Sequence, residues 1–223
     1  MPEPVSTVRQ LPRGRHGLPR ATVVAAQRDR ILTAMADAMA ENGYVGTSVA
    51  AIIKRAGVSR ETFYEQFRSK EDCFEAAYER AVRLLLDRIT EAARALADSD
   101  SGLEVRMRAL LTAYLDGLAS EPAYARLYLV EVYAVGPKAL ARRALLQESF
   151  VEMLAETLGA RTEPQRFACQ ALVAALSSMV TTRVAADDTA GLHALREPML
   201  ELVRRSGDLF GAAPAEQPVF SRG

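Results

Sequence analysis

A long proline-free stretch is the feature that most constrains the fold of this chain. The chain has 223 residues and 10 prolines, yet no proline lies between Arg20 and Glu121. The stretch is rich in Ala, Leu, Arg and Glu, which lose little side-chain entropy in a helix, and each residue in it keeps the backbone N–H that a helix needs. No sustained alternation of polar and apolar residues indicates strands. The sequence therefore predicts an all-α protein.

Glycines and the spacing of apolar residues divide the chain into helices. A first helix is expected at about 23–42, where Gly43 ends it. Its inner face carries Ile31, Met35 and Met39 at positions i, i+4 and i+8. Two short helices follow, and longer amphipathic helices are expected at 70–96, 103–119, 122–135, 137–158, 163–186 and 189–205. Pro198 falls inside the last of these, so that segment is expected to be kinked or divided into two helices.

The two short helices meet at an Ala-Gly-Val corner, where Gly57 can adopt a left-handed backbone conformation. Their sequences are VAAIIKRA and SRETFYEQF. This is the plan of a helix-turn-helix, whose second helix enters the major groove of DNA. Phe63 and Phe67, four residues apart, are expected to face the core. The opposite face of the second helix then carries Arg60, Glu61, Thr62, Tyr64 and Glu65.

The charge distribution supports DNA contact at this end of the chain. The whole chain is neutral, with 28 basic and 28 acidic side chains, but residues 1–70 hold eleven Lys and Arg against six acids. Arg60 is expected to bind guanine and Glu61 to accept from a cytosine amino group. Tyr64 and Lys70 are placed to contact phosphates. Since phosphates repel carboxylates, at least one of Glu61 and Glu65 is expected to pair with an arginine or to read a base.

The segment SVAAIIKRAGVSRETFYEQFRSKEDCF resembles the DNA-binding segment of the tetracycline-repressor (TetR) family of bacterial transcriptional regulators. Residues of the family pattern appear at Ser48, Ile52, Ala56, Gly57, Val58, Ser59, Thr62, Tyr64, Phe67, Lys70 and Glu71. The departures are Ser48 where Thr is usual, Ile53 where Ala is usual and Cys73 where Leu is usual. These departures affect local packing and leave the resemblance intact.

The resemblance implies a homodimer with three DNA-binding helices and a helical regulatory domain that binds a small ligand. We expect a flexible basic arm at 1–20, a helix-turn-helix domain at 21–70, a ligand-binding and dimerisation domain at 71–206 and a disordered tail at 207–223. The expected partners are double-stranded operator DNA, a small-molecule effector and a second copy of the chain. The expected DNA contacts are Arg13, Arg15, Ser48, Lys54, Ser59, Arg60, Glu61, Thr62, Tyr64 and Lys70.

The second half of the chain indicates only where a ligand and a second copy would bind. Aromatic and methionine side chains are candidates for an apolar ligand cavity, and ordinary core packing is the alternative for each of them. Glu131 and Arg183 are the candidate polar anchors, and the alternative for them is a solvated face or a structural ion pair. The ligand candidates are Tyr114, Tyr124, Tyr128, Glu131, Phe150, Met153, Phe167, Met179 and Arg183. The last two long helices are expected to pair with their copies in a four-helix bundle. The dimer candidates are Leu172, Val173, Leu176, Met179, Val180, Leu195, Met199, Leu202 and Val203.

No catalytic motif and no metal-ligand spacing is found, so neither an enzyme nor a cofactor is expected. Cys73 and Cys169 fall inside apolar helical patterns, which predicts buried thiols. No stretch approaches the roughly 18 uncharged apolar residues of a membrane span, so we expect a cytoplasmic protein without membrane contact. The favoured function is a ligand-responsive repressor. The alternatives are an activator of the same fold, or a helical ligand carrier or enzyme with a vestigial DNA-binding module.

Overall fold

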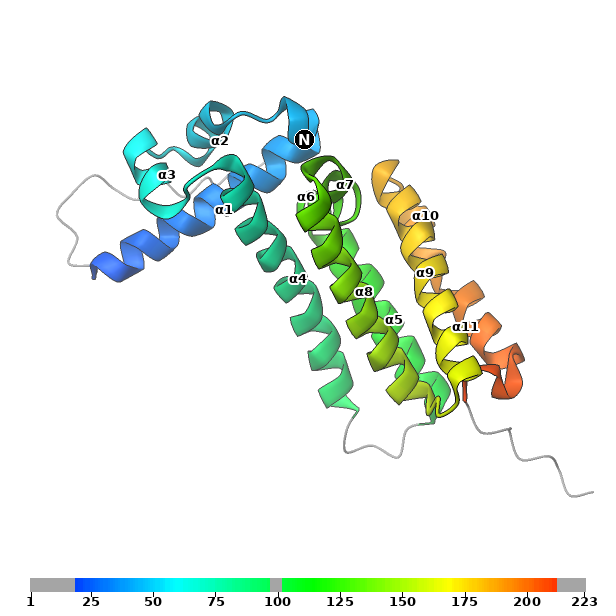
Figure 1. Cartoon of the computed structure of the whole chain (residues 1–223). Coiled ribbons are helices and arrows are strands. Elements are labelled where there is room, and N and C mark those ends of the chain that lie inside the picture. The colour runs from blue at the N-terminus through cyan, green and yellow to red at the C-terminus, as the bar shows by residue number, and fades with distance from the viewer. Residues whose placement is uncertain (1–18, 97–101, 212–223) are drawn as a thin grey trace, which may run out of the picture.

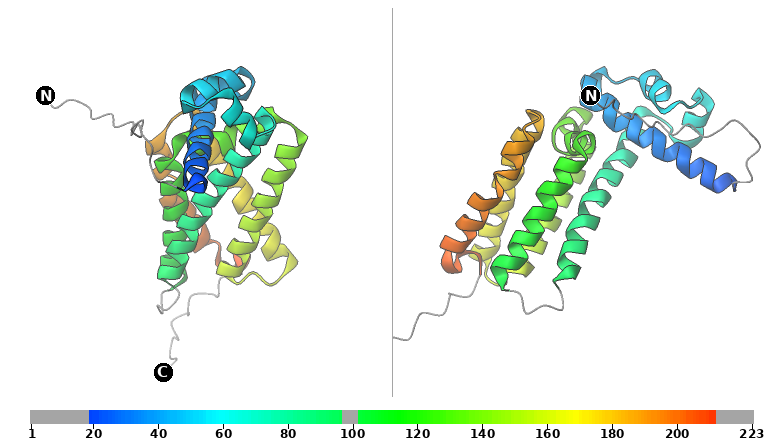
Figure 2. Two further views of the ribbon diagram at one scale, coloured as in Figure 1. Left: turned by 90° about the vertical axis from the view of Figure 1, so that its left-hand side faces the viewer. Right: turned by 180° about the vertical axis from the view of Figure 1, so that it is seen from behind.

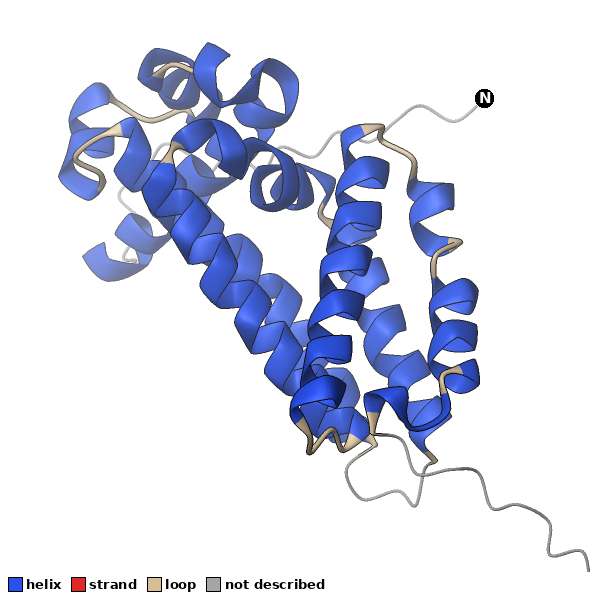
Figure 3. Ribbon diagram, turned by 45° about the vertical axis from the view of Figure 1, so that its right-hand side comes forward, coloured by secondary structure: helices blue, strands red, loops and turns tan. Residues whose placement is uncertain are grey.

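The computed structural model describes residues 19–96 and 102–211, and all regular structure within these residues is helical (Figure 3). The all-α prediction is confirmed. Three helices and the start of a fourth form the end of the molecule that is predicted to contact DNA, which we call the DNA-binding end. They are α1 (Arg20–Gly46), α2 (Val49–Ala56), α3 (Arg60–Gln66) and α4 (Lys70–Ala95). Figure 1 shows α1, α2 and α3 gathered at one end of α4.

The core of the DNA-binding end consists of the apolar side chains that were predicted to be buried from their helical spacing. Ile31, Met35 and Met39 of α1 are fully buried, and Phe63 and Phe67 close the core from the side of α3. Fully burying side chains of this size contributes about 1.5–3 kcal/mol each. The spacing of apolar residues therefore accounts for how α3 is held against α1.

Glycine and serine set the ends of these helices. Gly43 has φ 68°, which breaks the helical path near the C-terminus of α1, at the predicted stop. Gly57 is left-handed, with φ 62°, and ends α2. Ser48, Ser59 and Ser69 are N-caps, each accepting a hydrogen bond from a backbone N–H in the first turn of its helix. The corner between α2 and α3 is thus fixed by local sequence.

The rest of the chain forms a second layer of long helices alongside α4. Their bounds are α5 (Leu103–Ser120), α6 (Pro122–Arg126), the π-helical segment η1 (Leu127–Glu131), α7 (Val132–Val135), α8 (Pro137–Leu158), α9 (Glu163–Ala185), α10 (Thr189–His193), α11 (Arg196–Arg205) and the 3-10 turn η2 (Gly207–Phe210). α4 packs along α5, and α8 packs along α9 (Figure 2). α4 therefore belongs to both ends of the molecule.

Three expected elements differ in detail from the structure. The helix expected at 122–135 is wound as a π-helix over Leu127–Glu131, which inserts extra backbone into the turn and shifts the faces that follow. The helix expected at 189–205 is two helices, one of the two outcomes expected for it, and Pro198 lies in the first turn of α11, where a missing N–H costs little. The tail expected to be disordered from 207 begins with η2, whose Phe210 is buried.

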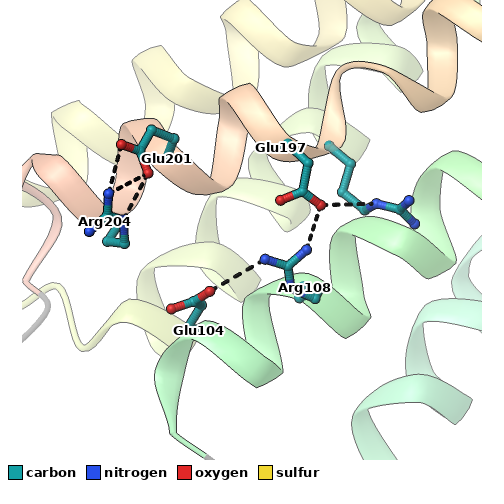
Figure 4. A network of polar contacts seen from close by, with 6 residues as sticks. Glu104, Arg108, Glu197, Glu201 and Arg204 are labelled. Carbon is teal, nitrogen blue, oxygen red and sulfur yellow. Dashed lines mark hydrogen bonds and ion pairs between the residues drawn. The ribbon is translucent and has the colours of Figure 1, made fainter.

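A network of ion pairs fastens α11 to α5 (Figure 4). Arg108 of α5 pairs with Glu104 on its own helix and with Glu197 of α11. Glu201 pairs with two arginines one turn further along α11. These side chains are exposed and screened by water, so they orient α11 more than they stabilise the fold.

Candidate DNA-binding surface and ligand cavity

The serine and threonine hydroxyls predicted to contact DNA form hydrogen bonds at the N-termini of the two short helices. Ser59 Oγ accepts from the backbone N–H of Thr62 at 3.0 Å and is bonded to the Thr62 hydroxyl at 2.9 Å. Ser48 Oγ accepts from the backbone N–H of Ala51 at 3.1 Å. Ser48, Ser59 and Thr62 therefore position the two short helices, and the DNA contacts of their hydroxyls stay predictions.

The outer face of α3 carries the side chains that remain free for DNA. Arg60, Glu61, Tyr64 and Glu65 are exposed, as their helical positions predict. The guanidinium of Arg60 lies 5.3 Å from the centre of the Tyr64 ring, and this ring stands edge-on to Phe63. Tyr64 thereby fixes the direction in which Arg60 projects. In the described part of the chain neither Glu61 nor Glu65 forms an ion pair, so neutralisation by an arginine of this chain does not occur there.

The structure gives Lys70 a role other than the predicted phosphate contact. Its ammonium donates to the backbone carbonyls of Tyr44 at 2.9 Å and Thr47 at 3.1 Å, and it lies 4.0 Å from the centre of the Tyr44 ring. Two of the three donors are used inside the domain. Lys70 therefore braces the turn between α1 and α2 against the start of α4.

Among the remaining predicted DNA contacts, Lys54 is exposed and forms no ion pair within the described residues. Its neighbour Arg55 instead pairs with Glu41 and Asp37 of α1. Lys54 is therefore the cation of α2 that is available to a phosphate. Arg13 and Arg15 lie outside the described residues.

Glu131, predicted as a polar anchor in a ligand cavity, points instead toward the DNA-binding end. Its Oε2 accepts from the backbone N–H of Tyr44 at 2.8 Å, and its Oε1 lies 3.6 Å from Arg126 Nε. Glycine suits position 43 because of its positive φ of 68°, and a Cβ atom there would be in ordinary contact with Oε2 at 3.4 Å. The carboxylate joins η1 to the turn after α1.

A mostly apolar cavity of about 120 Å³ lies between α4, α5, η1, α8 and α9. Four of the predicted ligand residues line it, namely Tyr114, Tyr128, Phe150 and Met153. The other lining residues were not predicted as ligand contacts from the sequence. These are Ile89, Met107, Leu110, Leu111, Gln147, Leu154, Thr157, Val173, Leu176 and Ser177.

The other predicted ligand residues lie elsewhere. Tyr124 is buried against α1, with its hydroxyl 3.4 Å from that of Thr33. Phe167 is 70% exposed and Met179 lies on the same outer face of α9, because the opposite face of that helix packs into the core. Arg183 pairs with Asp188 at 2.9 Å beyond the end of α9. None of these, nor Glu131, lines the cavity.

Burial raises the pKa of two phenols in the cavity wall and of both cysteine thiols. It raises the pKa of Tyr114 and Tyr128, and the charge of Arg143 partly opposes this rise. Burial also raises the pKa of Cys73 to about 12 and raises that of Cys169. Both thiols are free and buried, as the sequence predicted.

Most of the residues predicted for the dimer interface serve the protomer's own core. The buried ones are Leu172, Val180, Met199 and Val203. Val173 and Leu176 line the cavity, and Leu195 is half-buried. Met179 and Leu202 are exposed. The free apolar surface of α9 is instead formed by Phe167, Ala171, Ala174, Ala175 and Met179, together with small polar residues.

By length and composition α9 is the single described helix that could cross a membrane, and 28% of the relevant window is buried in this protomer. The same composition is expected of a helix that packs on the core with one face and on another helix with the other. Close approach of two helices favours small residues such as the alanines of this exposed face. The free face of α9 therefore fits a protein contact.

Comparison with known proteins finds similarity to bacterial transcriptional regulators. Residues 31–77 match the family described as bacterial regulatory proteins, tetR family. The chain is 27% identical over 123 residues to the HTH-type transcriptional activator FasR of Mycolicibacterium smegmatis, and the match covers 55% of this chain and 54% of that protein. The chain thus spans about half the length of this curated relative.

Solved structures share the fold over most of the chain. The fatty acid degradation regulator FadR from Bacillus halodurans is 24% identical, with a TM-score of 0.66 and coverage of 79% of this chain and 94% of that one. FadR from Bacillus subtilis, solved in complex with stearoyl-CoA, is 22% identical, with a TM-score of 0.63 and coverage of 78% and 96%. At this identity the likeness shows the fold.

Proposed function

We propose that this chain, whose residues 31–77 match the tetR family of bacterial regulatory proteins, binds a palindromic operator as a dimer, represses transcription and is released by a small, mostly apolar ligand. The DNA-binding surface is the outer face of α3 with Lys54 of α2. The ligand site is the cavity between α4, α5, η1, α8 and α9.

The observation that carries the proposal is a chain of aromatic contacts from the cavity to the DNA-binding end. Tyr128, in the cavity wall, packs on Tyr78 of α4 with ring centroids 5.7 Å apart. Tyr78 packs on Phe74 at 6.0 Å, and Phe74 stands edge-on to Tyr44 at 5.7 Å. Tyr44 is also the residue that Lys70 braces. A ligand that displaces Tyr128 therefore acts on the end of α4 that directly follows α3 in the chain.

A tilt of α4 would regulate DNA binding because it changes the distance between the two copies of α3, the recognition helix, in a dimer. In a dimer these helices must match half-sites about 34 Å apart or a multiple of this distance. A ligand that binds only the tilted form lowers DNA affinity by the difference in its affinity for the two forms, typically ~1–3 kcal/mol. By linkage, DNA lowers the affinity for the ligand by the same factor.

Two observations support an acyl compound as the ligand. The cavity is lined by aliphatic, aromatic and methionine side chains with few polar groups. Similar folds occur in a fatty acid degradation regulator and in a regulator bound to stearoyl-CoA. A hydrocarbon chain has the apolar surface that such a lining removes from water.

The outer face of α9 supports dimerisation. It combines Phe167 and Met179 with several alanines between them, which lets two helices approach closely. A two-fold axis beside α9 would pair this face with its copy, as closed dimers require. The ion pairs that hold α11 on α5 keep the neighbouring surface in place.

The experiment that tests the proposal is genomic footprinting followed by a gel shift on the footprinted DNA. We expect binding of a palindromic site as a dimer, and dissociation of the complex on addition of a long-chain acyl compound. Failure to bind any genomic site would contradict the proposal.

Activation of transcription is the second candidate function, because the matched relative FasR is named as an activator. The DNA-binding surface and the cavity are the same in both cases. In vitro transcription from a promoter with the footprinted site separates them, since a repressor lowers transcript yield and an activator raises it.

A further inference from the structure

Arg143 of α8 is a buried arginine without a counter-ion. The residue is 7% exposed, and no carboxylate in the described part of the chain pairs with it. Its Nη2 donates to Ser177 Oγ at 2.9 Å, its guanidinium lies 5.1 Å from the centre of the Tyr133 ring, and its Nε has no partner. The adjacent Arg142, in contrast, pairs with Glu75 and Glu79. Since a buried charge is costly unless it is paired, Arg143 requires an explanation.

Arg143 is not itself part of the cavity wall, but its guanidinium is hydrogen-bonded directly to a residue of that wall. Ser177, which accepts its hydrogen bond, lines the cavity, and so does Gln147, one helical turn after Arg143. Tyr114 and Tyr128 line it too, and the charge of Arg143 acts on the pKa of both phenols. Polar groups from α5, η1, α8 and α9 thus converge near one buried cation. Arg143 and Gln147 belong to the N-terminal half of α8, and Figure 1 shows that α8 begins near the DNA-binding helices and runs away from them.

We propose that the cavity takes a fatty-acid-like monocarboxylate whose carboxylate binds at Arg143 and whose hydrocarbon chain points away from the DNA-binding end. A planar guanidinium matches a carboxylate bidentately, and the hydroxyls of Ser177, Tyr114 and Tyr128 supply further donors. The inference rests on the proposed function, because it assigns the head group of the ligand in the same cavity.

The space beyond the cavity fits this direction of binding. A second cavity of about 200 Å³ shares Leu110 and Thr157 with the first and is bounded by the exposed residues Arg106 and Glu156. A cavity of about 120 Å³ holds only the head and the first carbons, so a longer chain passes between Leu110 and Thr157. A coenzyme A thioester has no carboxylate at the end of its acyl chain, and its large head group would have to remain at the outer opening.

The test compares dodecanoate, its methyl ester and dodecanoyl-CoA by isothermal titration calorimetry on the full chain, below the micelle concentration. We expect dodecanoate to bind at least roughly tenfold more tightly than the ester, the order expected for one charge-assisted pair. Arg143→Met should abolish this preference and leave ester binding unchanged. Arg142→Met, at the adjacent ion-paired arginine, is the matched control and should keep the preference.

Thermal unfolding separates this role from a structural one. Replacing an unpaired buried charge by an apolar side chain of similar length should leave the midpoint of the unliganded protein unchanged or raise it. A large drop would show that Arg143 holds the fold together and would overturn the proposal.

Equal affinity for dodecanoate and its ester, or a preference that survives Arg143→Met, would also overturn it. A third outcome is that only dodecanoyl-CoA binds tightly and that Arg143→Met does not change its affinity. This outcome would overturn the carboxylate site at Arg143 but would leave the proposed function intact. The proposed function fails separately, if no acyl compound releases DNA.

Discussion

The buried carboxylate of Glu131 accepts a hydrogen bond from the backbone N–H of Tyr44 at 2.8 Å, across 87 residues of sequence. Glu131 is the last residue of the π-helical segment, and Tyr128, three residues earlier, lines the cavity. Because π-helical turns are uncommon and often occur at functional sites, this hydrogen bond supports the proposed role of η1 as the link between the cavity and the DNA-binding end.

Removing the acceptor should lower stability. Glu131→Ala leaves the buried N–H of Tyr44 without a partner, which should cost about 1–3 kcal/mol in free energy of unfolding. Urea denaturation followed by circular dichroism measures this cost. Glu131→Gln keeps an acceptor and should be destabilised less, while Glu148→Ala, at an exposed glutamate, should have almost the stability of the wild type. Equal stability of Glu131→Ala and the wild type would show that the hydrogen bond contributes nothing.

Interrupting the chain of aromatic contacts should reduce the effect of ligand on DNA affinity more than it reduces the affinity for DNA alone or for ligand alone. Tyr78→Leu removes the ring between Tyr128 and Phe74 while keeping an apolar side chain. We expect nearly unchanged affinity for DNA alone and for ligand alone, and a smaller ligand-induced change in DNA affinity. The comparison is made by fluorescence anisotropy with and without ligand. Leu209→Ala, at an exposed leucine of η2 outside this chain of contacts, is the control. Full coupling in Tyr78→Leu would exclude this route.

The two kinds of DNA contact should separate by mutation. Arg60→Ala should weaken binding to the operator by about 1–3 kcal/mol, because the bidentate hydrogen bonds of Arg60 to a base are removed. The variant should also lose sequence specificity at that one base position. Lys54→Ala should weaken binding to all sequences alike and reduce the slope of log K against log salt by about 0.9 for each phosphate that is no longer neutralised. Affinities at several salt concentrations, on operator and random DNA, provide the readout. Equal decreases on both DNAs for Arg60→Ala would contradict its base-reading role.

Replacing Lys70 should affect thermal stability, whereas replacing Lys54 should not. Since its ammonium bonds two backbone carbonyls, Lys70→Ala should lower the thermal midpoint as well as DNA affinity. Lys54→Ala should leave the midpoint unchanged. A Lys70→Ala protein with the wild-type midpoint and weaker DNA binding would return Lys70 to the phosphate-contact role that the sequence predicted.

A charge on the free face of α9 should prevent dimerisation. Ala174→Glu places a carboxylate where two copies of α9 would approach most closely, and burying it in an interface is costly. Light scattering at micromolar concentration should show a dimer for the wild type and a monomer for this variant. Leu145→Glu, at an exposed leucine of α8, should remain dimeric. A dimer in both variants would place the interface elsewhere.

Local signals made the DNA-binding end predictable from sequence. Gly43 and Gly57 end their helices because few other residues adopt a positive φ, and the serine caps act within one turn. Phe63 and Phe67, one helical turn apart, define one buried face. The role of Lys70 was missed because its acceptors lie in a turn more than twenty residues away.

In the second half the helices were predictable but their faces were not. α9 is apolar or small on both sides, so the sequence did not distinguish Leu172, which is buried, from Phe167, which is exposed. Arg142 and Arg143 are adjacent, and only the packing of α8 shows which one is buried. The π-helical segment has no sequence signature of its own, yet it directs Glu131 toward Tyr44.

The central claim is that an acyl ligand in the cavity controls binding of DNA by α3. Its most direct test is a titration of a long-chain acyl compound into the complex of the full chain with footprinted operator DNA, followed by fluorescence anisotropy. We predict a fall in DNA affinity of roughly 5–150-fold at saturating ligand, the usual range of allosteric coupling. The same titration of Phe150→Trp, which reduces the cavity, should shift the midpoint to higher ligand concentration. Ligand that binds tightly and leaves DNA affinity unchanged would contradict the account.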